Sequence, residues 1–205
     1  MNGEAEKMSK FEYIIGIDEV GRGPIAGPVA VCALCLCHGS TLANFRNFRD
    51  SKKLSHIQRV KWLTKINEEK KKGNIIYKVS FASNKIIDKK GIVFAINKCL
   101  VNSLNFLNIK AKESLVLLDG GLRAPKEYIN QKTIIKGDEK ELVIALASIV
   151  AKETRDNLMI KLARKYSGYS LEKHKGYGTA AHYKALKNKG FSAIHRKSFL
   201  KKLDR

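Results

Sequence analysis

The apolar positions of the chain fall into short runs and longer helical patterns. Five short runs are rich in β-branched or aromatic residues and bounded by turn-forming or polar residues, which is typical of strands. They lie at residues 11–17, 28–37, 74–81, 114–118 and 131–136. Three longer segments have apolar residues at helical spacing and predict helices at residues 56–72, 91–107 and 139–166. Residues 167–205 are expected to form loop and short helix.

The order of these elements predicts an α/β layer fold with a mixed sheet. The first two strands follow each other directly and should be neighbours, whereas the later strands are joined by helices that can act as crossovers. A length of 205 residues suits a single globular domain. We expect an α/β unit over residues 1–166, with residues 167–205 packed on it as a basic C-terminal segment.

Cysteine content and apolar run lengths exclude several protein classes. Three of the four cysteines (Cys32, Cys35 and Cys37) share one predicted strand, and Cys99 stands apart. This pattern fits neither a disulfide scaffold nor a zinc site, so buried reduced thiols are expected. No apolar run is long enough for a membrane helix, and the polar N-terminus does not resemble a signal peptide. We therefore expect a cytoplasmic protein without membrane association.

The chain is strongly basic, with 40 Lys and Arg residues against 19 Asp and Glu residues, a net charge of +21. Such a charge favours a polyanionic partner, above all nucleic acid. Codon bias is an alternative explanation, because 31 of the basic residues are Lys. However, residues 151–205 alone hold 15 basic and four acidic residues, and this uneven distribution favours the nucleic-acid interpretation.

Four carboxylates stand at the ends of predicted strands. Asp18 and Glu19 end the first strand, Asp119 ends a central strand, and Asp138 separates the last strand from the long helix. Strand ends of one sheet can meet at one edge, and carboxylate oxygens suit Mg²⁺ and Mn²⁺. Two such ions about 4 Å apart are well suited to cleaving a phosphodiester. The pattern predicts a metal-dependent site for phosphate chemistry.

Each carboxylate also has a purely structural explanation. Asp18 and Glu19 are neighbours in a strand and should face opposite sides, so they share a site only if the chain bends there. Asp119 precedes Gly120 and could form an ordinary turn. Residues 138–141 fit a helix capping box. It is the combination of all four with a glycine-rich turn that favours the functional interpretation.

That turn is formed by Gly21, Arg22 and Gly23. It could simply link two strands. Glycine, however, lets backbone amides approach a ligand closely, and arginine binds phosphate well. A backbone-lined turn beside a metal site is suited to inspecting a sugar, whose 2′-hydroxyl distinguishes RNA from DNA.

Blocks of sequence along nearly the whole chain resemble bacterial ribonuclease HII. The first block is residues 15–29, IGIDEVGRGPIAGPV. The others follow in the family's order: DSKKLS at 50–55, LDG at 118–120, KGD at 136–138, ASIVAK at 147–152, TRD at 154–156, HKGYGT at 174–179, His182 and HRKSF at 195–199. One short block could arise by chance, whereas this many in order is highly specific.

The resemblance implies a ribonuclease H-like fold, in which helices flank a five-stranded mixed sheet and a helical C-terminal extension follows. It implies an endonuclease that uses Mn²⁺ or Mg²⁺ to cleave the RNA strand of RNA–DNA hybrids. It further implies incision on the 5′ side of single ribonucleotides in duplex DNA, leaving 3′-hydroxyl and 5′-phosphate ends. We expect the protein to act as a monomer.

The resemblance also implies roles for individual residues. The metal ligands would be Asp18, Glu19 and Asp119, with Asp138 completing the catalytic set. The residues expected to contact the substrate are Gly21, Arg22, Gly23, Tyr177, Lys52 and Lys53. In this set the turn senses the 2′-hydroxyl, Tyr177 packs on the sugar, and the two lysines contact phosphate. Lys152 and Asp156 are expected to be structural.

Two positions depart from the family pattern. Gly178 stands where a proline usually follows the tyrosine, and its backbone freedom makes the position of Tyr177 less constrained. Residues 139–147, EKELVIALA, replace a proline-containing stretch and can all be helical. The long helix is therefore expected to begin early, with Asp138 near its N-cap.

Other functions compete with this one. Ribonuclease HIII and the junction resolvases are nucleases of the same fold class, but the glycine-arginine-glycine turn argues against a resolvase and the short N-terminal region argues against ribonuclease HIII. A non-catalytic basic nucleic-acid-binding module is the third alternative. It would gain nothing from carboxylates directed at phosphates.

Overall fold

The computed structural model describes residues 10–37, 45 and 54–201. The strands are β1 (Tyr13–Val20), β2 (Val29–Leu36), β3 (Ile75–Ala82), β4 (Ser114–Asp119) and β5 (Gln131–Ile134). The helices are α2 (His56–Lys71), α3 (Asn84–Lys90), α4 (Ile92–Leu107), α5 (Gly137–Lys140), α6 (Leu142–Lys165), α7 (Leu171–His174) and α8 (Ala180–Lys189). Two short 3-10 helices, η3 (Ala111–Glu113) and η4 (Lys197–Phe199), are also present.

The five strands form one mixed sheet in the order β3-β2-β1-β4-β5. β1, β2 and β3 are antiparallel neighbours, whereas β4 and β5 run parallel to β1. The expected α/β fold with a five-stranded mixed sheet is therefore confirmed. The parallel strands β1 and β4 end at the same edge of the sheet, which is where a site can be built from both.

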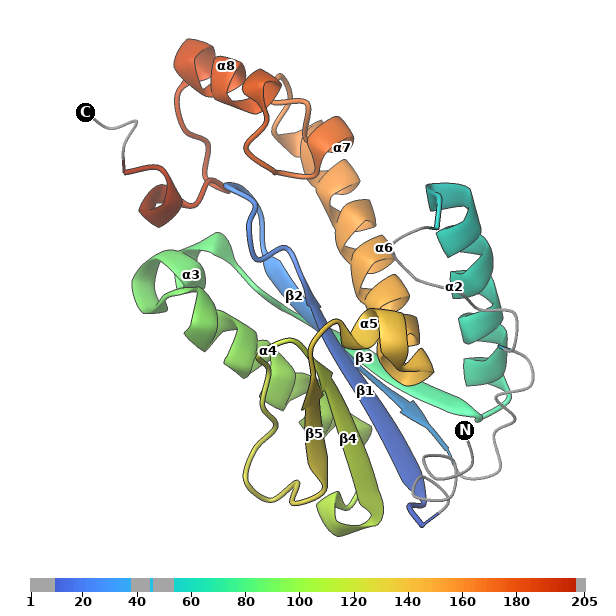
Figure 1. Ribbon diagram of the computed structural model, residues 1–205. Helices are drawn as coiled ribbons and strands as arrows, with labels where there is room; N and C mark the ends of the chain where they lie inside the picture. Colours follow the sequence, from blue (N-terminus) through green and yellow to red (C-terminus); the bar gives the residue numbers. More distant parts are fainter. Residues whose placement is uncertain (1–9, 38–44, 46–53, 202–205) are drawn as a thin grey trace.

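Helices cover both faces of the sheet, with α3 and α4 on one side and α2, α5 and α6 on the other (Figure 1). Alternate residues of β1 divide between two cores. Ile15 and Ile17 pack with α4, whereas Ile14 and Val20 pack with α6. The closest approach of α6 is at Gly16, where a Cβ atom would collide with the backbone of Val143. A glycine is required there because no side chain fits between strand and helix.

The C-terminal segment packs on the loop between β1 and β2 and on the end of α6. Its apolar cluster joins Ile25 and Ala26 of that loop to Met159 of α6 and to the later Tyr169, Leu171, Leu186, Ile194 and Leu200. Backbone hydrogen bonds reinforce this packing, with Ile25 and Ala26 both donating to the carbonyl of Gly176. Whether the chain divides into two units at residue 166 stays a prediction.

The helix expected over residues 139–166 is not continuous. Glu141 adopts an extended conformation (φ −118°, ψ 118°) and separates the short α5 from α6. The residues themselves are helix-competent, but tertiary contacts override that preference. The amide of Gly137 in α5 is fixed to Asp119, while α6 is fixed against Gly16 of β1. These two separate anchors favour a break between the helices.

Smaller features follow the sequence with some differences. Ser55 caps α2 and forms a capping box with Gln58. All four cysteines are free, but Cys37 is only partly buried, which differs from the expectation of buried thiols. The short helix α3 lies outside the predicted elements. No helix of the described residues is long and apolar enough to cross a membrane.

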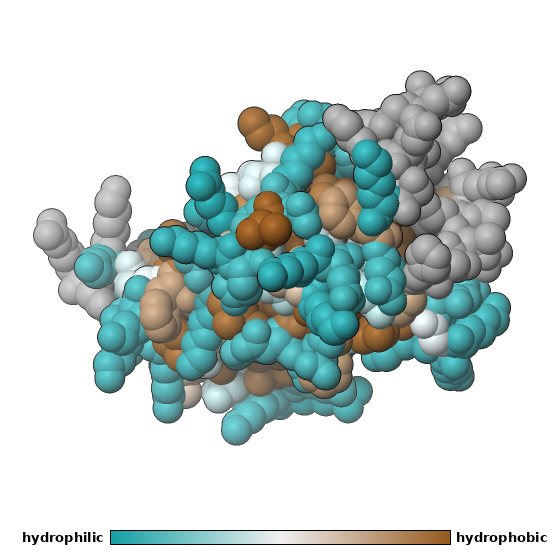
Figure 2. All heavy atoms as spheres, turned by 90° about the horizontal axis from the view of Figure 1, so that it is seen from below, coloured by the Kyte–Doolittle hydropathy of each residue, from teal (hydrophilic) through white to brown (hydrophobic). Residues whose placement is uncertain are grey.

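Hydrophilic side chains cover most of the face seen in Figure 2, and apolar residues show there as scattered patches. The part of this face not covered by grey atoms therefore presents no single large apolar area.

Candidate active site

Three carboxylates meet at the edge where β1 and β4 end. Asp18, Glu19 and Asp119 each place an oxygen within 4.8 Å of the others. Asp18 is nearly buried, whereas Glu19 and Asp119 are partly exposed. Among the described residues, these three form the one group of acidic, histidine or cysteine side chains that lie close enough together to hold a metal ion.

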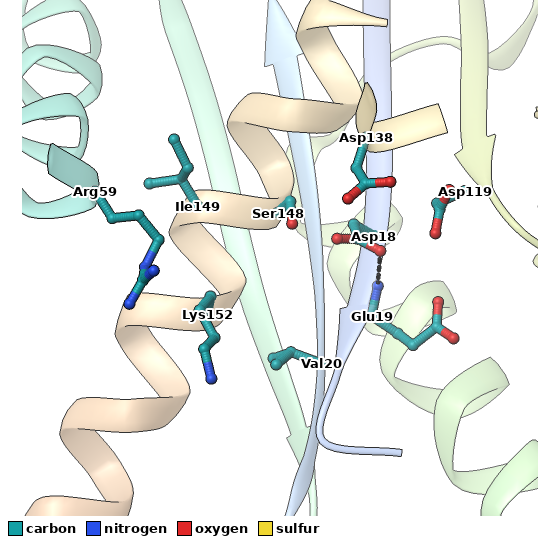
Figure 3. Close-up of a pocket in the computed structure, with 9 residues that line it drawn as sticks. All are labelled: Asp18, Glu19, Val20, Arg59, Asp119, Asp138, Ser148, Ile149 and Lys152. Carbon is teal, nitrogen blue, oxygen red and sulfur yellow. Dashed lines mark hydrogen bonds between the residues drawn. The ribbon is translucent and has the colours of Figure 1, made fainter. Parts of the chain in front are cut away.

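The register of the strands explains this convergence. Pairing between β1 and β4 ends with Ile17 opposite Leu118, so Asp18 and Asp119 follow on adjacent strands. Glu19 belongs to the opposite face of β1, and the sequence interpretation required a bend to bring it to the site. β1 instead continues to Val20. Because β4 stops at Asp119, the Glu19 side chain has room to turn toward that residue (Figure 3).

Asp138 enters the site from α5. It is buried and lies beside Asp18 in the same cavity (Figure 3). The amide of Gly137 donates a 2.6 Å hydrogen bond to Asp119 Oδ1, which ties α5 to the end of β4. The N-cap of α5 is Lys136 and that of α6 is Glu141. The expectation that Asp138 sits near the N-cap of the long helix is therefore wrong, since Asp138 lies inside α5 and faces the carboxylates.

The carboxylates line one side of a cavity of about 350 Å³. The opposite side carries positive charge, from Lys152 of α6 and Arg59 of α2 (Figure 3). Arg59 Nε donates to the buried Glu153 at 2.6 Å, and Lys152 Nζ lies 3.1 Å from an oxygen of Asp156. Lys152 and Asp156, which the sequence analysis expects to be structural, thus pair with each other, and Lys152 in addition borders the cavity.

The surroundings of Asp18 and Glu19 favour the protonated, neutral form of these carboxyl groups. Burial raises the pKa of Asp18 to about 8, and the nearby charges of Asp119, Glu19 and Asp138 add to this rise, while a hydrogen bond from Ser148 opposes it. Burial also raises the pKa of Glu19, against the opposing effect of Arg22. Carboxylates crowded in this way gain most when a cation neutralises them.

One oxygen of this cluster is without a partner. Glu19 Oε2 is buried and accepts no hydrogen bond from the described residues. A buried carboxylate oxygen normally has a donor or a cation beside it. The donor set is made only of hard oxygen atoms, which suits Mg²⁺ or Mn²⁺. The residues present therefore fit a divalent cation held by Asp18, Glu19 and Asp119.

The glycine-rich turn lies directly beside the carboxylates. Arg22 Nη1 is 3.5 Å from Glu19 Oε1. Gly21 has a φ of +85°, and a Cβ atom there would overlap the side chain of the buried Arg155. A second buried arginine, Arg196, donates to the carbonyls of Gly21 (2.7 Å) and Arg22 (3.0 Å). The shape of the turn is thus set by arginines far away in the sequence.

Tyr177 stands on the other side of the turn. Tyr177 is 40% exposed, and a Cβ atom built on Gly23 would lie 3.8 Å from its ring atom Cε1. Backbone hydrogen bonds hold the tyrosine on both sides, since its amide donates to His174 and its carbonyl accepts from Thr179. Gly178, the departure noted in the sequence, packs against the ring of Tyr183. The structure thus brings the turn and Tyr177 together.

The sequence alone gave no sign of some of these neighbours. Arg155 and Arg196 sit in motif blocks, but nothing in the sequence shows that they reach the turn. Arg59 stands in an amphipathic helix, and no local pattern singles it out. Lys52 and Lys53 lie outside the described residues.

Comparison with known proteins shows the family of the chain. Residues 15–202 match the ribonuclease HII family. The chain belongs to the ribonuclease HII family. It is 45% identical to ribonuclease HII of Clostridium beijerinckii over 97% of this chain and 71% of that protein. It is 40% identical to ribonuclease HII of Caldicellulosiruptor bescii over 94% of this chain and 89% of that protein. Family membership makes this protein a type 2 ribonuclease H, an endonuclease.

Solved structures share the fold at low sequence identity. The ribonuclease H2 of Pyrococcus horikoshii is 23% identical with a TM-score of 0.70, covering 94% of this chain and 97% of that one. The RNase HII in the PCNA complex of Archaeoglobus fulgidus is also 23% identical with a TM-score of 0.70, covering 89% and 93%. A Bst-RNase HIII in complex with Mn²⁺ is 16% identical with a TM-score of 0.64, covering 95% and 66%. These likenesses support the fold of the ribonuclease HII family.

Proposed function

We propose that this ribonuclease HII depends on Mn²⁺ or Mg²⁺ and cleaves the RNA strand of RNA–DNA hybrids. We further propose that it incises duplex DNA on the 5′ side of a single embedded ribonucleotide, leaving 3′-hydroxyl and 5′-phosphate ends, and that it acts as a monomer. The observation that carries the proposal is the position of a tight carboxylate cluster directly beside a glycine-rich turn and an exposed tyrosine ring.

In this proposal Asp18, Glu19 and Asp119 hold the divalent cations, and Asp138 completes the site from α5. When bound, such ions supply an activated water and stabilise the leaving oxygen of a phosphodiester. The protein contributes a fixed set of ligands, because both strand ends and the Gly137–Asp119 hydrogen bond hold the carboxylates in place. The crowding that disfavours their charge without a cation also disfavours an approaching phosphate until the charge is offset.

The turn and Tyr177 select the sugar. Arg22 and Gly23 are exposed, and their amides have no acceptor among the described residues. They can donate to a 2′-hydroxyl, which deoxyribose lacks. Tyr177 faces Gly23 from the other side, and its ring supplies an apolar surface for the sugar. A ribose held there lies close to Glu19, because Arg22 of the turn contacts Glu19.

The basic surface holds the duplex over this acidic site. The net charge of +21 attracts the phosphate backbone without regard to sequence. On the cavity wall opposite the carboxylates, Lys152 and Arg59 can offset the charge of a phosphate that spans the cavity. Lys52 and Lys53 are proposed as further phosphate contacts.

A cleavage assay on three labelled substrates tests the proposal. These are an RNA–DNA hybrid, a DNA duplex with one ribonucleotide, and the same duplex without it. We expect cleavage of the first two with Mn²⁺ or Mg²⁺, no cleavage in EDTA, and no cleavage of the all-DNA duplex. The single-ribonucleotide product should end in a 3′-hydroxyl that a DNA polymerase can extend.

Two outcomes would favour the alternatives. Metal-dependent cleavage of the hybrid without incision at the single ribonucleotide is the behaviour expected of a ribonuclease HIII-like enzyme. Salt-sensitive binding without any metal-dependent product is the behaviour expected of a non-catalytic binding module.

A further inference from the structure

Two buried histidines lie in contact behind Tyr177, away from the carboxylates. His182 belongs to α8 and His195 to the segment that follows it, and neither is more than 1% exposed. Their Nε2 atoms are 3.1 Å apart. The outer nitrogen of His182, Nδ1, lies 2.9 Å from the carbonyl oxygen of Tyr177. The outer nitrogen of His195, Nδ1, lies 2.9 Å from the amide nitrogen of Ser192.

The hydrogen-bond partners at the two ends of this pair, Ser192 and Tyr177, determine which ring nitrogens carry the protons. The amide of Ser192, 2.9 Å from Nδ1 of His195, can only donate, and the Ser192 hydroxyl at 2.8 Å can donate as well, so Nδ1 accepts and the proton of His195 is on Nε2. The Ser192 carbonyl oxygen, which would favour a proton on Nδ1, is farther away at 3.4 Å. The Nε2 proton of His195 points at Nε2 of His182, which must then accept. The proton of His182 is therefore on Nδ1 and is donated to the carbonyl of Tyr177, which can only accept. Every nitrogen is satisfied when both rings are neutral, and burial lowers the pKa of both histidines.

The same pair also connects to the segment after the glycine-rich turn. The backbone of His195 forms an isolated β-bridge with Ala26, which follows the turn closely in sequence. The side chain of His195 continues through His182 to Tyr177. The turn segment and the tyrosine are thus held from behind by one buried link.

Tyr177 needs such support because its own loop is irregular. Lys175 and Gly176 both have positive φ values, of 52° and 89°, and Gly178 follows the tyrosine. No strand or long helix fixes this stretch, so side-chain contacts to its backbone matter. The hydrogen bond from His182 to the carbonyl oxygen of Tyr177 connects this stretch to α8.

We propose that the His182–His195 pair is a positioning device that fixes Tyr177 against the Gly21–Gly23 turn and so sets selectivity for ribose over deoxyribose. This inference rests on the proposed role of the turn and Tyr177 in sensing the sugar. The histidines touch neither the carboxylates nor the cavity lining, so they act through the tyrosine.

Two variants of His182 separate its two hydrogen bonds. In His182→Asn the amide nitrogen occupies about the place of Nδ1 and can still donate to the Tyr177 carbonyl. In His182→Gln the amide reaches about the place of Nε2, which keeps the contact with His195 and loses the bond to Tyr177. Asn188→Ala, at an exposed position of the same helix, is the control.

We expect His182→Gln to lower kcat/KM on the single-ribonucleotide duplex about tenfold, as befits one lost buried hydrogen bond. The loss should lie in kcat, because the basic surface still binds the duplex. His182→Asn, which keeps the bond to Tyr177 but loses the contact with His195, should show a smaller but measurable loss, and Asn188→Ala should show none. Equal losses for the two His182 variants at equal melting temperatures would show that the bond to Tyr177 has no special role.

The proton arrangement is tested without any cleavage. Long-range ¹H–¹⁵N spectra of the wild-type protein at neutral pH should show His182 as the Nδ1–H form and His195 as the Nε2–H form. The opposite forms, or a charged ring, would overturn the proposal even if both variants fail to fold. A wild-type protein that makes no metal-dependent incision would instead sink the proposed function, and these spectra would still report on the histidine pair.

Discussion

Arg196 Nη2 donates a 2.7 Å hydrogen bond to the carbonyl oxygen of Gly21, joining two residues 175 positions apart. Its Nη1 reaches the next carbonyl, that of Arg22, at 3.0 Å. In a trans peptide the C=O and N–H groups point in opposite directions, and none of the described peptides is cis. With both carbonyls turned inward to Arg196, the amides of Arg22 and Gly23 must point outward. A buried arginine thus aims the two donors that the proposed function assigns to the sugar.

Replacing Arg196 with lysine should disturb both stability and selectivity. A single ammonium group cannot serve the carbonyls of Gly21, Arg22 and Gly27 that the guanidinium now serves. We expect the free energy of unfolding to fall by about 2–4 kcal/mol, and the melting temperature by about 5–15 °C. Differential scanning calorimetry measures the loss of stability. The ratio of cleavage rates on the duplexes with and without the ribonucleotide measures the selectivity, and this ratio should fall.

Arg164→Lys is the matched control, because Arg164 is exposed on α6. Arg164→Lys should leave the melting temperature and the cleavage ratio unchanged. If Arg196→Lys matched that control, the guanidinium would not be what shapes the turn.

The two glycines of the turn should respond differently to alanine. Gly21 has a positive φ and no room beside Arg155, so Gly21→Ala should lower the melting temperature and the cleavage rate together. Gly23 has ordinary backbone and space, with Tyr177 Cε1 at 3.8 Å from the added carbon. Gly23→Ala should keep the melting temperature within about 2 °C while narrowing the place proposed for the sugar.

Cleavage of the single-ribonucleotide duplex by Gly23→Ala is therefore the informative measurement. We expect a loss of about tenfold or more in kcat/KM at unchanged stability. Unchanged cleavage would mean that the sugar does not pass between Gly23 and Tyr177.

Local patterns predicted the strands and the carboxylates well because both are local in origin. β-branched and aromatic runs bounded by turn residues gave all five strands, and the acidic residues at their ends gave the cluster of Asp18, Glu19 and Asp119. Convergence of strand ends at one edge follows from the parallel pairing of β1 with β4. The role of Tyr177 follows only from a family resemblance, whereas the residues of the Gly21–Gly23 turn themselves already indicate a place for inspecting a sugar.

The break at Glu141 and the buried arginines could not be predicted in the same way. Residues 139–147 have good helix propensity, and only the anchoring of Gly137 to Asp119 reveals why the helix divides. Arg155 and Arg196 looked like two more members of a basic surface, yet both are fully buried. Net charge counts such residues without showing which of them face solvent.

Asp18→Asn should abolish cleavage while leaving the fold intact. The change removes a proposed cation ligand, and it keeps a neutral group at this buried position, which is the form that burial favours for Asp18 without a cation. We expect turnover to fall about a thousandfold or more with either Mn²⁺ or Mg²⁺. Binding of the duplex, measured by fluorescence anisotropy, should be about equal because the basic surface that binds it is unchanged.

Glu127→Gln serves as the control for Asp18→Asn, since Glu127 is an exposed carboxylate remote from the cavity. It should cleave at the wild-type rate. Near-normal turnover by Asp18→Asn would refute the assignment of the site.

Asp18 also makes the stability of the metal-free protein depend on pH. Its pKa of about 8 in the folded protein exceeds the value of about 3.9 in an unfolded chain. Between these values the folded protein keeps a proton that the unfolded chain has released. The contribution of Asp18 to stability is therefore complete below about pH 4 and is lost as the pH rises to about 8.

Melting temperatures of wild type and Asp18→Asn in EDTA test this relation. The melting temperature of wild type, relative to that of the variant, should fall between about pH 5 and about pH 8, because only the wild-type group titrates there. Added Mn²⁺ should then stabilise wild type more at about pH 8 than at about pH 5, since the cation competes with the proton for Asp18. A difference between the two proteins that stays constant across this range would contradict the raised pKa, and equal stabilisation of both by Mn²⁺ would place the cation away from Asp18.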